Sequence, residues 1–195
     1  MTRLQAGIVV ALRGRLFEVR TDEGARLKCE VRRKVKRAAD NTTPVAVGDD
    51  VRISRDGSKR GMIEEVLPRR SAFFRPTTGN ETIKQVIAAN LDRLAVVVSV
   101  SSPPLKTGLI DRCLVAGLNG ELESLVVLNK ADLEKPDDFE DIVGAYRSIG
   151  YAVFVVSAKK GEGLDALKEM LGGHRTLFAG HSGVGKSTLL NRLVP

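Results

Sequence analysis

The residues with the clearest chemical pattern lie near the end of the printed sequence. A glycine-rich stretch there matches the phosphate-loop pattern G-x-x-x-x-G-K-[ST], in which backbone N–H groups, a lysine and a hydroxyl surround phosphate oxygens. The apolar run before it, residues 175–179, suits a buried strand, and residues 187–193 have helical character. The pattern therefore predicts a nucleotide phosphate site in a strand–loop–helix setting. Its residues are Gly180, His181, Ser182, Gly183, Val184, Gly185, Lys186, Ser187 and Thr188.

The residue types in this loop indicate what each group does. The glycines allow a tight turn and leave room, so that N–H groups at the positive end of the following helix can face phosphate oxygens. We expect Lys186 to reach the β- and γ-phosphates and the Ser187 hydroxyl to coordinate Mg²⁺. We expect Thr188 to add a further phosphate contact. Lys186 and Ser187 are thus the candidate catalytic residues, and Ser187 is the candidate metal ligand.

Two other loops carry groups that suit recognition of a base. The sequence Asn-Lys-Ala-Asp at residues 129–132 follows the apolar run 124–128, and Ser-Ala-Lys at residues 157–159 follows the run 151–156. Because ligands bind outside the carboxyl ends of strands in such sheets, both loops are expected beside the phosphate loop. The candidate base-contacting residues are Asn129, Lys130, Ala131, Asp132, Ser157, Ala158 and Lys159.

The chemistry of these loops favours guanine. The Asp132 carboxylate can accept two hydrogen bonds from adjacent N–H groups, which guanine offers at N1 and N2 and adenine does not. Asn129 can brace the loop and contact the base, while the aliphatic stem of Lys130 can lie over the ring. The backbone N–H of Ala158 suits the guanine O6. The expected ligands are therefore GTP and GDP with Mg²⁺, although the phosphate loop alone would also fit an ATPase.

The elements that must position these loops follow from the apolar pattern of the second half. Continuous apolar runs alternate with stripes at helical spacing, which predicts a parallel sheet covered by helices. The predicted strands are residues 91–100, 124–128, 151–156 and 175–179, and the predicted helices lie near residues 109–118, 139–149, 164–171 and 187–193.

The first part of the chain has a different rhythm. Short alternating runs separated by turn residues predict an all-β barrel over residues 1–70, for which an OB fold is the obvious candidate and an SH3-like barrel the rival. Residues 71–90 lose that rhythm and are predicted to be a linker, with a mobile loop at 76–80. The predicted strands are residues 7–11, 16–20, 26–31, 50–54 and 62–66.

Charge is concentrated in the same part of the chain. Residues 1–75 hold 18 Lys+Arg and 10 Asp+Glu, a net charge of +8, whereas residues 76–195 hold 13 and 14. A basic module predicts a polyanionic partner. The barrel contains few aromatic residues, so folded RNA recognised through its backbone is favoured over stacked single strands. The candidate phosphate-contacting residues are Arg32, Arg33, Lys34, Lys36 and Arg37.

Several classes of protein do not fit the composition. Cys29 and Cys113 lie far apart in apolar runs, which indicates buried thiols in a reducing compartment and no disulfide framework. The two histidines have no Cys or His neighbours at the spacing of a structural zinc site. No apolar run reaches membrane-spanning length. We expect a cytoplasmic monomer that does not enter a membrane.

The order of the motifs is unusual. In Ras-like GTPases the phosphate loop comes first, whereas here the loops at 129–132 and 157–159 precede it. The chain therefore resembles a circularly permuted GTPase, an α/β P-loop domain over residues 91–195 behind an OB-like barrel. With the stretches at 84–92 and 109–114, it resembles the RsgA (YjeQ) family of ribosome small subunit-dependent GTPases. The resemblance implies GTP hydrolysis stimulated by the small (30S) ribosomal subunit, a role in maturation of that subunit and contact with 16S rRNA.

Two features expected from the resemblance are missing from the printed sequence. A γ-phosphate-sensing threonine and a D-x-x-G segment should follow the phosphate loop, yet the only D-x-x-G match, residues 141–144, lies in a helical stripe. The family's C-terminal zinc module, with its ligands, is also absent. We therefore expect a fragment of a longer protein. The alternative to a GTPase is a guanine-nucleotide and rRNA-binding module that does not hydrolyse.

Overall fold

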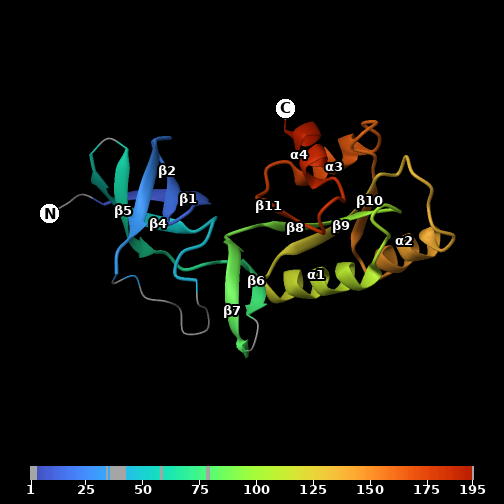
Figure 1. The fold of residues 1–195 in the computed structure, drawn as a ribbon, viewed down its shortest axis with the longest axis horizontal. Coiled ribbons are helices and arrows are strands. Elements are labelled where there is room, and N and C mark those ends of the chain that lie inside the picture. The colour runs from blue at the N-terminus through green and yellow to red at the C-terminus, as the bar shows by residue number, and fades with distance from the viewer. Residues whose placement is uncertain (1–3, 34, 36–42, 58, 78–79, 195) are drawn as a thin grey trace. The chain divides into compact units, whose positions relative to one another are not determined.

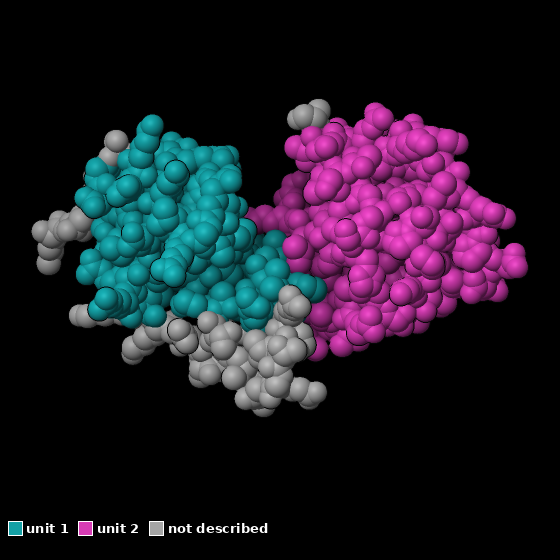
Figure 2. Space-filling model, in the orientation of Figure 1, with its two compact units in different colours: residues 1–91 teal, residues 92–195 magenta. Residues whose placement is uncertain are grey.

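The computed structural model describes residues 4–33, 35, 43–57, 59–77 and 80–194 (Figure 1). The chain divides into two compact units, residues 1–91 and residues 92–195, which Figure 2 shows in different colours. Each unit has its own hydrophobic core.

The first unit contains a closed barrel in the order β1-β2-β3-β5-β4. β3 runs parallel to β5, and the other neighbouring strands are antiparallel. This closure fits the OB-like barrel and resolves the choice against the SH3-like rival. Inward-facing apolar side chains fill the barrel, among them Val19, Cys29, Ile53 and Ile63. The strands are β1 (Gln5–Arg13), β2 (Leu16–Thr21), β3 (Arg26–Val31), β4 (Asp50–Asp56) and β5 (Arg60–Val66).

The segment predicted to be a linker forms a hairpin. β6 (Ala72–Thr77) pairs with β7 (Asn80–Ala89) in an antiparallel ladder. The register shifts between Phe73 and Phe74 and again between Pro76 and Thr77, so the period-2 alternation that reveals a strand is broken twice. Of the predicted loop at 76–80, residues 78–79 lie outside the described residues and the others belong to the two strands.

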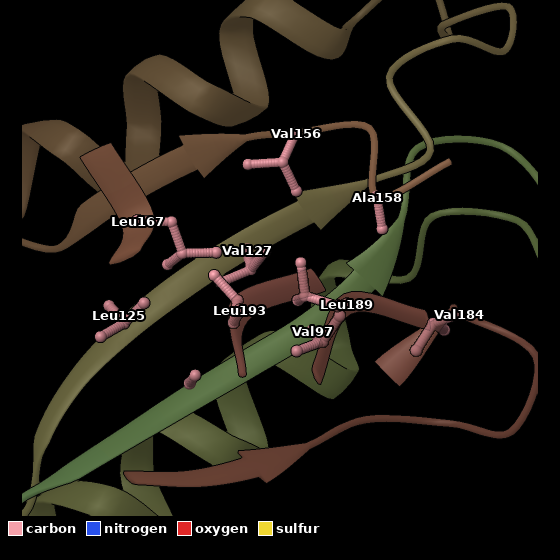
Figure 3. Close-up of a cluster of buried hydrophobic side chains, with 10 residues drawn as sticks. Val97, Leu125, Val127, Val156, Ala158, Leu167, Val184, Leu189 and Leu193 are labelled. Atoms are coloured by element: carbon pink, nitrogen blue, oxygen red, sulfur yellow. The ribbon is translucent and has the colours of Figure 1, made fainter. Parts of the chain in front are cut away.

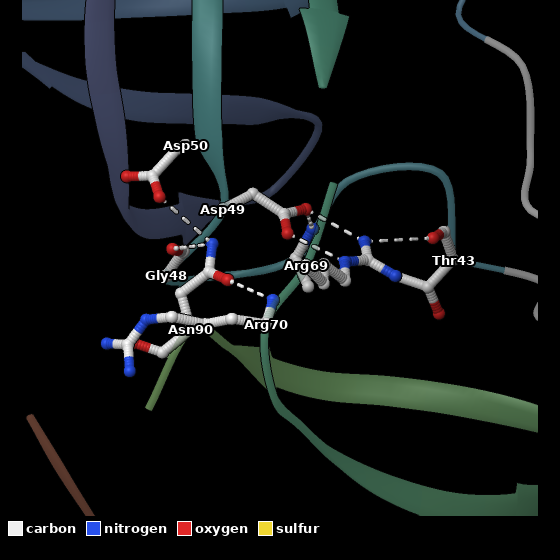
Figure 4. Close-up of polar contacts among 8 residues, drawn as sticks. Thr43, Gly48, Asp49, Asp50, Arg69, Arg70 and Asn90 are labelled. Atoms are coloured by element: carbon white, nitrogen blue, oxygen red, sulfur yellow. Dashed lines mark hydrogen bonds and ion pairs between the residues drawn. The ribbon is translucent and has the colours of Figure 1, made fainter. Parts of the chain in front are cut away.

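A buried polar cluster ties this hairpin to the barrel (Figure 4). The Asp49 carboxylate is fully buried, accepts bonds from Arg69 Nε and Nη2 at 2.7 and 2.8 Å, and accepts a third from the Ala46 N–H at 2.7 Å. Asn90, just after β7, donates to the Gly48 carbonyl at 3.1 Å. A buried carboxylate needs such partners, because its desolvation is otherwise uncompensated. The cluster therefore fixes both ends of the hairpin on the barrel.

The second unit is built on a parallel sheet in the order β10-β9-β8-β11. The two central strands of the sheet, β8 and β9, are the longest. They are also the most buried, and every residue of β8 from Leu94 to Val98 is at most 3% exposed. Such continuous apolar strands are typical of a sheet covered on both faces. The strands are β8 (Arg93–Ser99), β9 (Glu123–Asn129), β10 (Ala152–Val155) and β11 (Thr176–Ala179).

Helices cover both faces of this sheet (Figure 1). α1 and α2 lie on one face and are joined by the Tyr146 hydroxyl, which donates to Asp111 Oδ1 at 2.8 Å. α3 and α4 lie on the other face, where Leu167 and Leu189 pack against Val97 and Val127 in a buried cluster (Figure 3). The helices are α1 (Thr107–Asn119), α2 (Phe139–Ser148), α3 (Leu164–Leu171) and α4 (Lys186–Leu193). None of the helices in the described part of the chain is long and apolar enough to cross a membrane.

Candidate nucleotide-binding site

The phosphate loop connects β11 to α4, as the sequence predicts. Its glycines are required by their surroundings. A Cβ on Gly185, which has φ 92°, would lie 2.4 Å from Asn129 Nδ2, and a Cβ on Gly180 would lie 2.0 Å from the Val97 carbonyl oxygen. Side chains at these positions would displace the loop, so the sequence can fold this way only with glycine there. Ser182 and Ser187 are exposed, and Val184 is buried beneath the loop.

Lys186, the first residue of α4, folds back over its own loop. Its ammonium group donates to the carbonyl oxygens of Gly180 at 2.8 Å and His181 at 2.7 Å. These contacts hold the amine at the loop, at the positive end of α4, where the N–H groups of a helix start also favour an anion. Ser187 follows it on the first turn of α4, with its side chain exposed.

Asn129 joins all three loops. Its side chain is 1% exposed, donates through Nδ2 to the Val184 carbonyl at 2.9 Å and accepts through Oδ1 from the Ala158 N–H at 3.0 Å. Both bonds are made by buried groups, for which loss of a partner is costly. The Ala131 N–H adds a bond to the Val156 carbonyl at 3.0 Å. The 129–132 loop is therefore fixed to the phosphate loop on one side and to the 157–159 loop on the other.

The Asp132 carboxylate is held by the neighbouring loop. The buried Ser157 hydroxyl donates to Asp132 Oδ1 at 2.6 Å and itself accepts from the Lys160 N–H at 3.1 Å. The bond from Ser157 lowers the pKa of Asp132 below its ordinary value of 3.8, and the positive charges of Lys159 and Lys160 act in the same direction. Asp132 is therefore ionised at neutral pH, as an acceptor of two N–H groups must be.

Residues from all three loops line one cavity of about 360 Å³, a size in the usual range of small-molecule pockets. Ser157, Lys186 and Ser187 are not among its lining residues. The cavity brings the two predicted base-contacting loops together with the phosphate loop. It is lined by Asn129, Lys130, Asp132, Leu133, Ala158, Lys159, Gly185 and Thr188. Leu133 was not among the predicted residues, although an apolar residue next to Asp132 is a natural wall for an aromatic base.

Two contacts around the site have no sequence signal. Lys130 Nζ donates to the carbonyl oxygen of Ser102 at 2.6 Å, in the loop that follows β8. Arg192 of α4 makes a comparable backbone contact, from Nη2 to the Lys159 carbonyl at 3.3 Å. Both contacts use backbone oxygens as acceptors, and any residue type provides one. No motif could have revealed them.

The Ser157–Asp132 contact gives a pH prediction. Replacing Ser157 by alanine should raise the pKa of Asp132 toward 3.8, because the largest cause of its depression is removed. The native contact stabilises the fold fully above the unfolded-state pKa, and that stability is lost as pH falls through the lower folded-state pKa. Carboxyl ¹³C NMR titration of Asp132 measures the shift.

Ser148→Ala is the matched control, because that variant also loses a hydroxyl bonded within the same unit, to the Ala145 carbonyl at 2.8 Å. The Asp132 pKa should be unchanged in it. An Asp132 pKa that stayed equally low in Ser157→Ala would mean that the serine does not hold the carboxylate.

The remaining candidate residues lie elsewhere. Asp141, of the D-x-x-G match, lies in α2 and outside the cavity, as its helical stripe predicts. Arg32 pairs with Glu64 at 2.5 Å and Arg33 is exposed, whereas Lys34, Lys36 and Arg37 lie outside the described residues. Among the described residues, no group of three or more His, Cys, Asp or Glu side chains gathers as a metal site would require. The Mg²⁺ prediction therefore depends on the Ser187 hydroxyl and on the phosphates of the nucleotide.

Comparison with known proteins shows which family the chain resembles. A family model described as RsgA GTPase matches residues 66–195. The "Small ribosomal subunit biogenesis GTPase RsgA" of Sodalis glossinidius is 41% identical over 199 residues, covering 98% of this chain and 54% of the relative. The protein of the same name from Bacteroides fragilis is 37% identical over 193 residues, covering 97% and 62%. The chain thus spans about three-fifths of the length of these curated relatives.

Solved structures show the same fold. YjeQ from Thermotoga maritima matches with a TM-score of 0.75 and 34% identity, covering 99% of this chain and 66% of that one. YloQ, described as a circularly permuted GTPase, matches with a TM-score of 0.69 and 29% identity, covering 97% and 64%. The permuted order, in which β9 and β10 precede β11 and its phosphate loop, is therefore shared. The chain belongs to the RsgA GTPase family.

Proposed function

We propose that this chain binds GTP and GDP with Mg²⁺, and that the protein to which it belongs hydrolyses GTP during biogenesis of the small ribosomal subunit. The observation that carries the proposal is the single cavity lined by Asp132, Ala158 and Gly185, one residue from each of the three predicted loops. The names of the relatives support the same activity and the same ribosomal partner.

The base is recognised by protein donors and acceptors that match those of guanine. Asp132 accepts from N1–H and N2–H of guanine. The Ala158 N–H, which donates to Asn129 Oδ1 at 3.0 Å in the unliganded protein, donates to O6 when the base binds. Lys130 covers the ring with its stem, and Asn129 holds its loop against the phosphate loop through its bond to the Val184 carbonyl. An adenine base would place an acceptor against Asp132 and a donor against Ala158, so it should be rejected strongly.

The phosphates are bound by Lys186 and by the N–H groups of the loop. Lys186 already lies at the loop through its bonds to two loop carbonyls, so little reorganisation is needed when it meets the β- and γ-phosphates. Bound Mg²⁺ supplies charge neutralisation between those phosphates. Ser187 would hold the ion, because a hydroxyl is a hard oxygen ligand of the kind Mg²⁺ prefers, and Thr188 adds a contact at the cavity wall.

The barrel is proposed to bind 16S rRNA as a separate module, residues 1–70, in a cytoplasmic monomer. Its support is charge, since residues 1–75 carry a net charge of +8. The proposed contact residues are Arg32, Arg33, Lys34, Lys36 and Arg37.

Fluorescent GDP and GTP analogues test the proposal directly. GDP, GTP, ADP and XDP are titrated against the bound probe, and we expect displacement by the guanine nucleotides at concentrations about 1,000-fold lower than by ADP. Equal displacement by ADP would favour a P-loop ATPase. Phosphate release measured with and without small ribosomal subunits then separates hydrolysis from binding alone, and we expect very slow release by this chain by itself.

A further inference from the structure

A buried serine, the last residue of β8, organises the loop that follows that strand. Ser99 is 1% exposed, and its Oγ accepts hydrogen bonds from the N–H groups of Ser101 at 3.3 Å and Ser102 at 3.0 Å. The same hydroxyl donates to the Ser102 carbonyl at 2.8 Å. A hydroxyl has one proton and two lone pairs, so these three bonds use its full capacity. The position of the Ser102 carbonyl is therefore set by Ser99.

The Ser102 carbonyl is also the acceptor for Lys130 Nζ, at 2.6 Å. Lys130 lines the cavity, so its stem is at the cavity wall while its tip is bonded to the β8 loop. Its backbone has φ 64°, in the left-handed region, which turns the side chain away from the direction of the strand. The anchor at Ser102 thus defines where the end of a long, flexible side chain lies.

The sheet brings the two segments together. Ser99 is the register partner of Asn129 in the parallel β8–β9 pair, and the Val100 N–H donates to the Asn129 carbonyl at 3.0 Å. The β8 loop and the 129–132 loop consequently leave the same edge of the sheet side by side. Ser99 is separated from Lys130 by one carbonyl group and two hydrogen bonds.

We propose that Ser99 is a positioning residue for base binding, which acts through the Ser102 carbonyl by holding Lys130 in its place over the base. The proposal rests on the proposed function, since it concerns the same cavity. A free lysine side chain loses much rotamer freedom when it is fixed, and pre-ordering it in the unliganded protein removes that cost from binding. Ser99 therefore contributes to affinity without touching the nucleotide.

The first test compares Ser99→Ala with wild type in a GDP titration. The variant removes the hydroxyl and no carbon atom, and we expect GDP affinity to fall about 5-fold, mainly through faster dissociation. Ser124→Ala is the matched control, because it removes a hydroxyl bonded to a backbone carbonyl, that of Leu122, at the opposite end of the same sheet. GDP affinity of this control should equal that of wild type.

A double-mutant cycle separates positioning from a merely structural role. Lys130→Met keeps the stem over the base and removes the bond to Ser102. In that background Ser99→Ala should have no further effect on GDP affinity, because the hydrogen bond that links Ser102 to residue 130 is already absent. An equal loss in both backgrounds would overturn the proposal, as would wild-type affinity in Ser99→Ala alone.

Three further outcomes are distinguishable. If Ser99→Ala does not fold, Ser99→Cys replaces it in the same cycle, since a thiol of similar size is a weak donor and acceptor and should lose affinity in the same direction. If wild type itself does not bind GDP, the proposed function fails. If wild type binds and the cycle is additive, only the positioning role of Ser99 fails.

Discussion

Lys186→Ala is expected to lower the affinity for GDP and GTP about 1,000-fold, because it removes the charged donor proposed to bind the phosphates. The same change removes the two bonds to the carbonyl oxygens of Gly180 and His181, which leaves those acceptors to the solvent and loosens the loop. Loss of charge and loss of loop order act in the same direction. Calorimetric titration with GDP and with a non-hydrolysable GTP analogue measures the effect.

The control for this prediction is Lys168→Ala, an exposed lysine of α3 outside the base cavity. This variant has the same change of net charge, so it controls for long-range electrostatics. Its affinity for GDP should stay within about 2-fold of the wild-type value. A Lys186→Ala protein that bound GDP as tightly as Lys168→Ala would show that the glycine-rich loop is not the phosphate site.

The short motifs made most of the candidate site predictable. The phosphate loop and the two candidate base-contacting loops are contiguous stretches with fixed residue types, and each follows a strand whose apolar run is visible in the sequence. Because parallel strands end at one edge of a sheet, predicting the strands was enough to bring Asp132 and Gly185 to one cavity. The gathering of these three loops could therefore be predicted with little tertiary information.

Other features depend on tertiary contacts that leave no local pattern. The sequence of the β6–β7 hairpin predicts a linker and not strands, because two register shifts and Pro76 remove its alternation. β3 pairs with β5 although β4 lies between them in the sequence, and the hydrophobic periodicity of the strands does not indicate this pairing. The bond from Lys130 to Ser102 joins residues 28 positions apart through a backbone oxygen. Such contacts are decided by packing, and sequence patterns report packing only indirectly.

Asp132→Asn is expected to change the choice of base. The amide N–H of the new side chain would face the N2–H of guanine, so that two donors would meet. Xanthine has a carbonyl oxygen at C2 in place of this amino group, and that oxygen can accept from the amide. A site that hydrogen-bonds one group rejects its mismatched analogue by about 10⁴-fold, so the ratio of XDP to GDP affinity should rise by that order. Competition of GDP and XDP against a fluorescent nucleotide measures the ratio, and Asp137→Asn, an exposed acid outside the cavity, should leave it unchanged.

Ser157 determines how the amide of Asp132→Asn is oriented, and so how strongly the base preference changes. Its hydroxyl donates to Asp132 Oδ1 at 2.6 Å, and in the variant it can donate only to the amide oxygen, which leaves Nδ2 in the place of the second carboxylate oxygen, facing the base. Removing the hydroxyl as well, in Asp132→Asn/Ser157→Ala, frees the amide to rotate, so the gain for xanthine should shrink. An Asp132→Asn protein that kept the guanine preference of wild type would mean that another group reads the base, since an asparagine has one acceptor oxygen and cannot offer a separate oxygen to each N–H group of guanine.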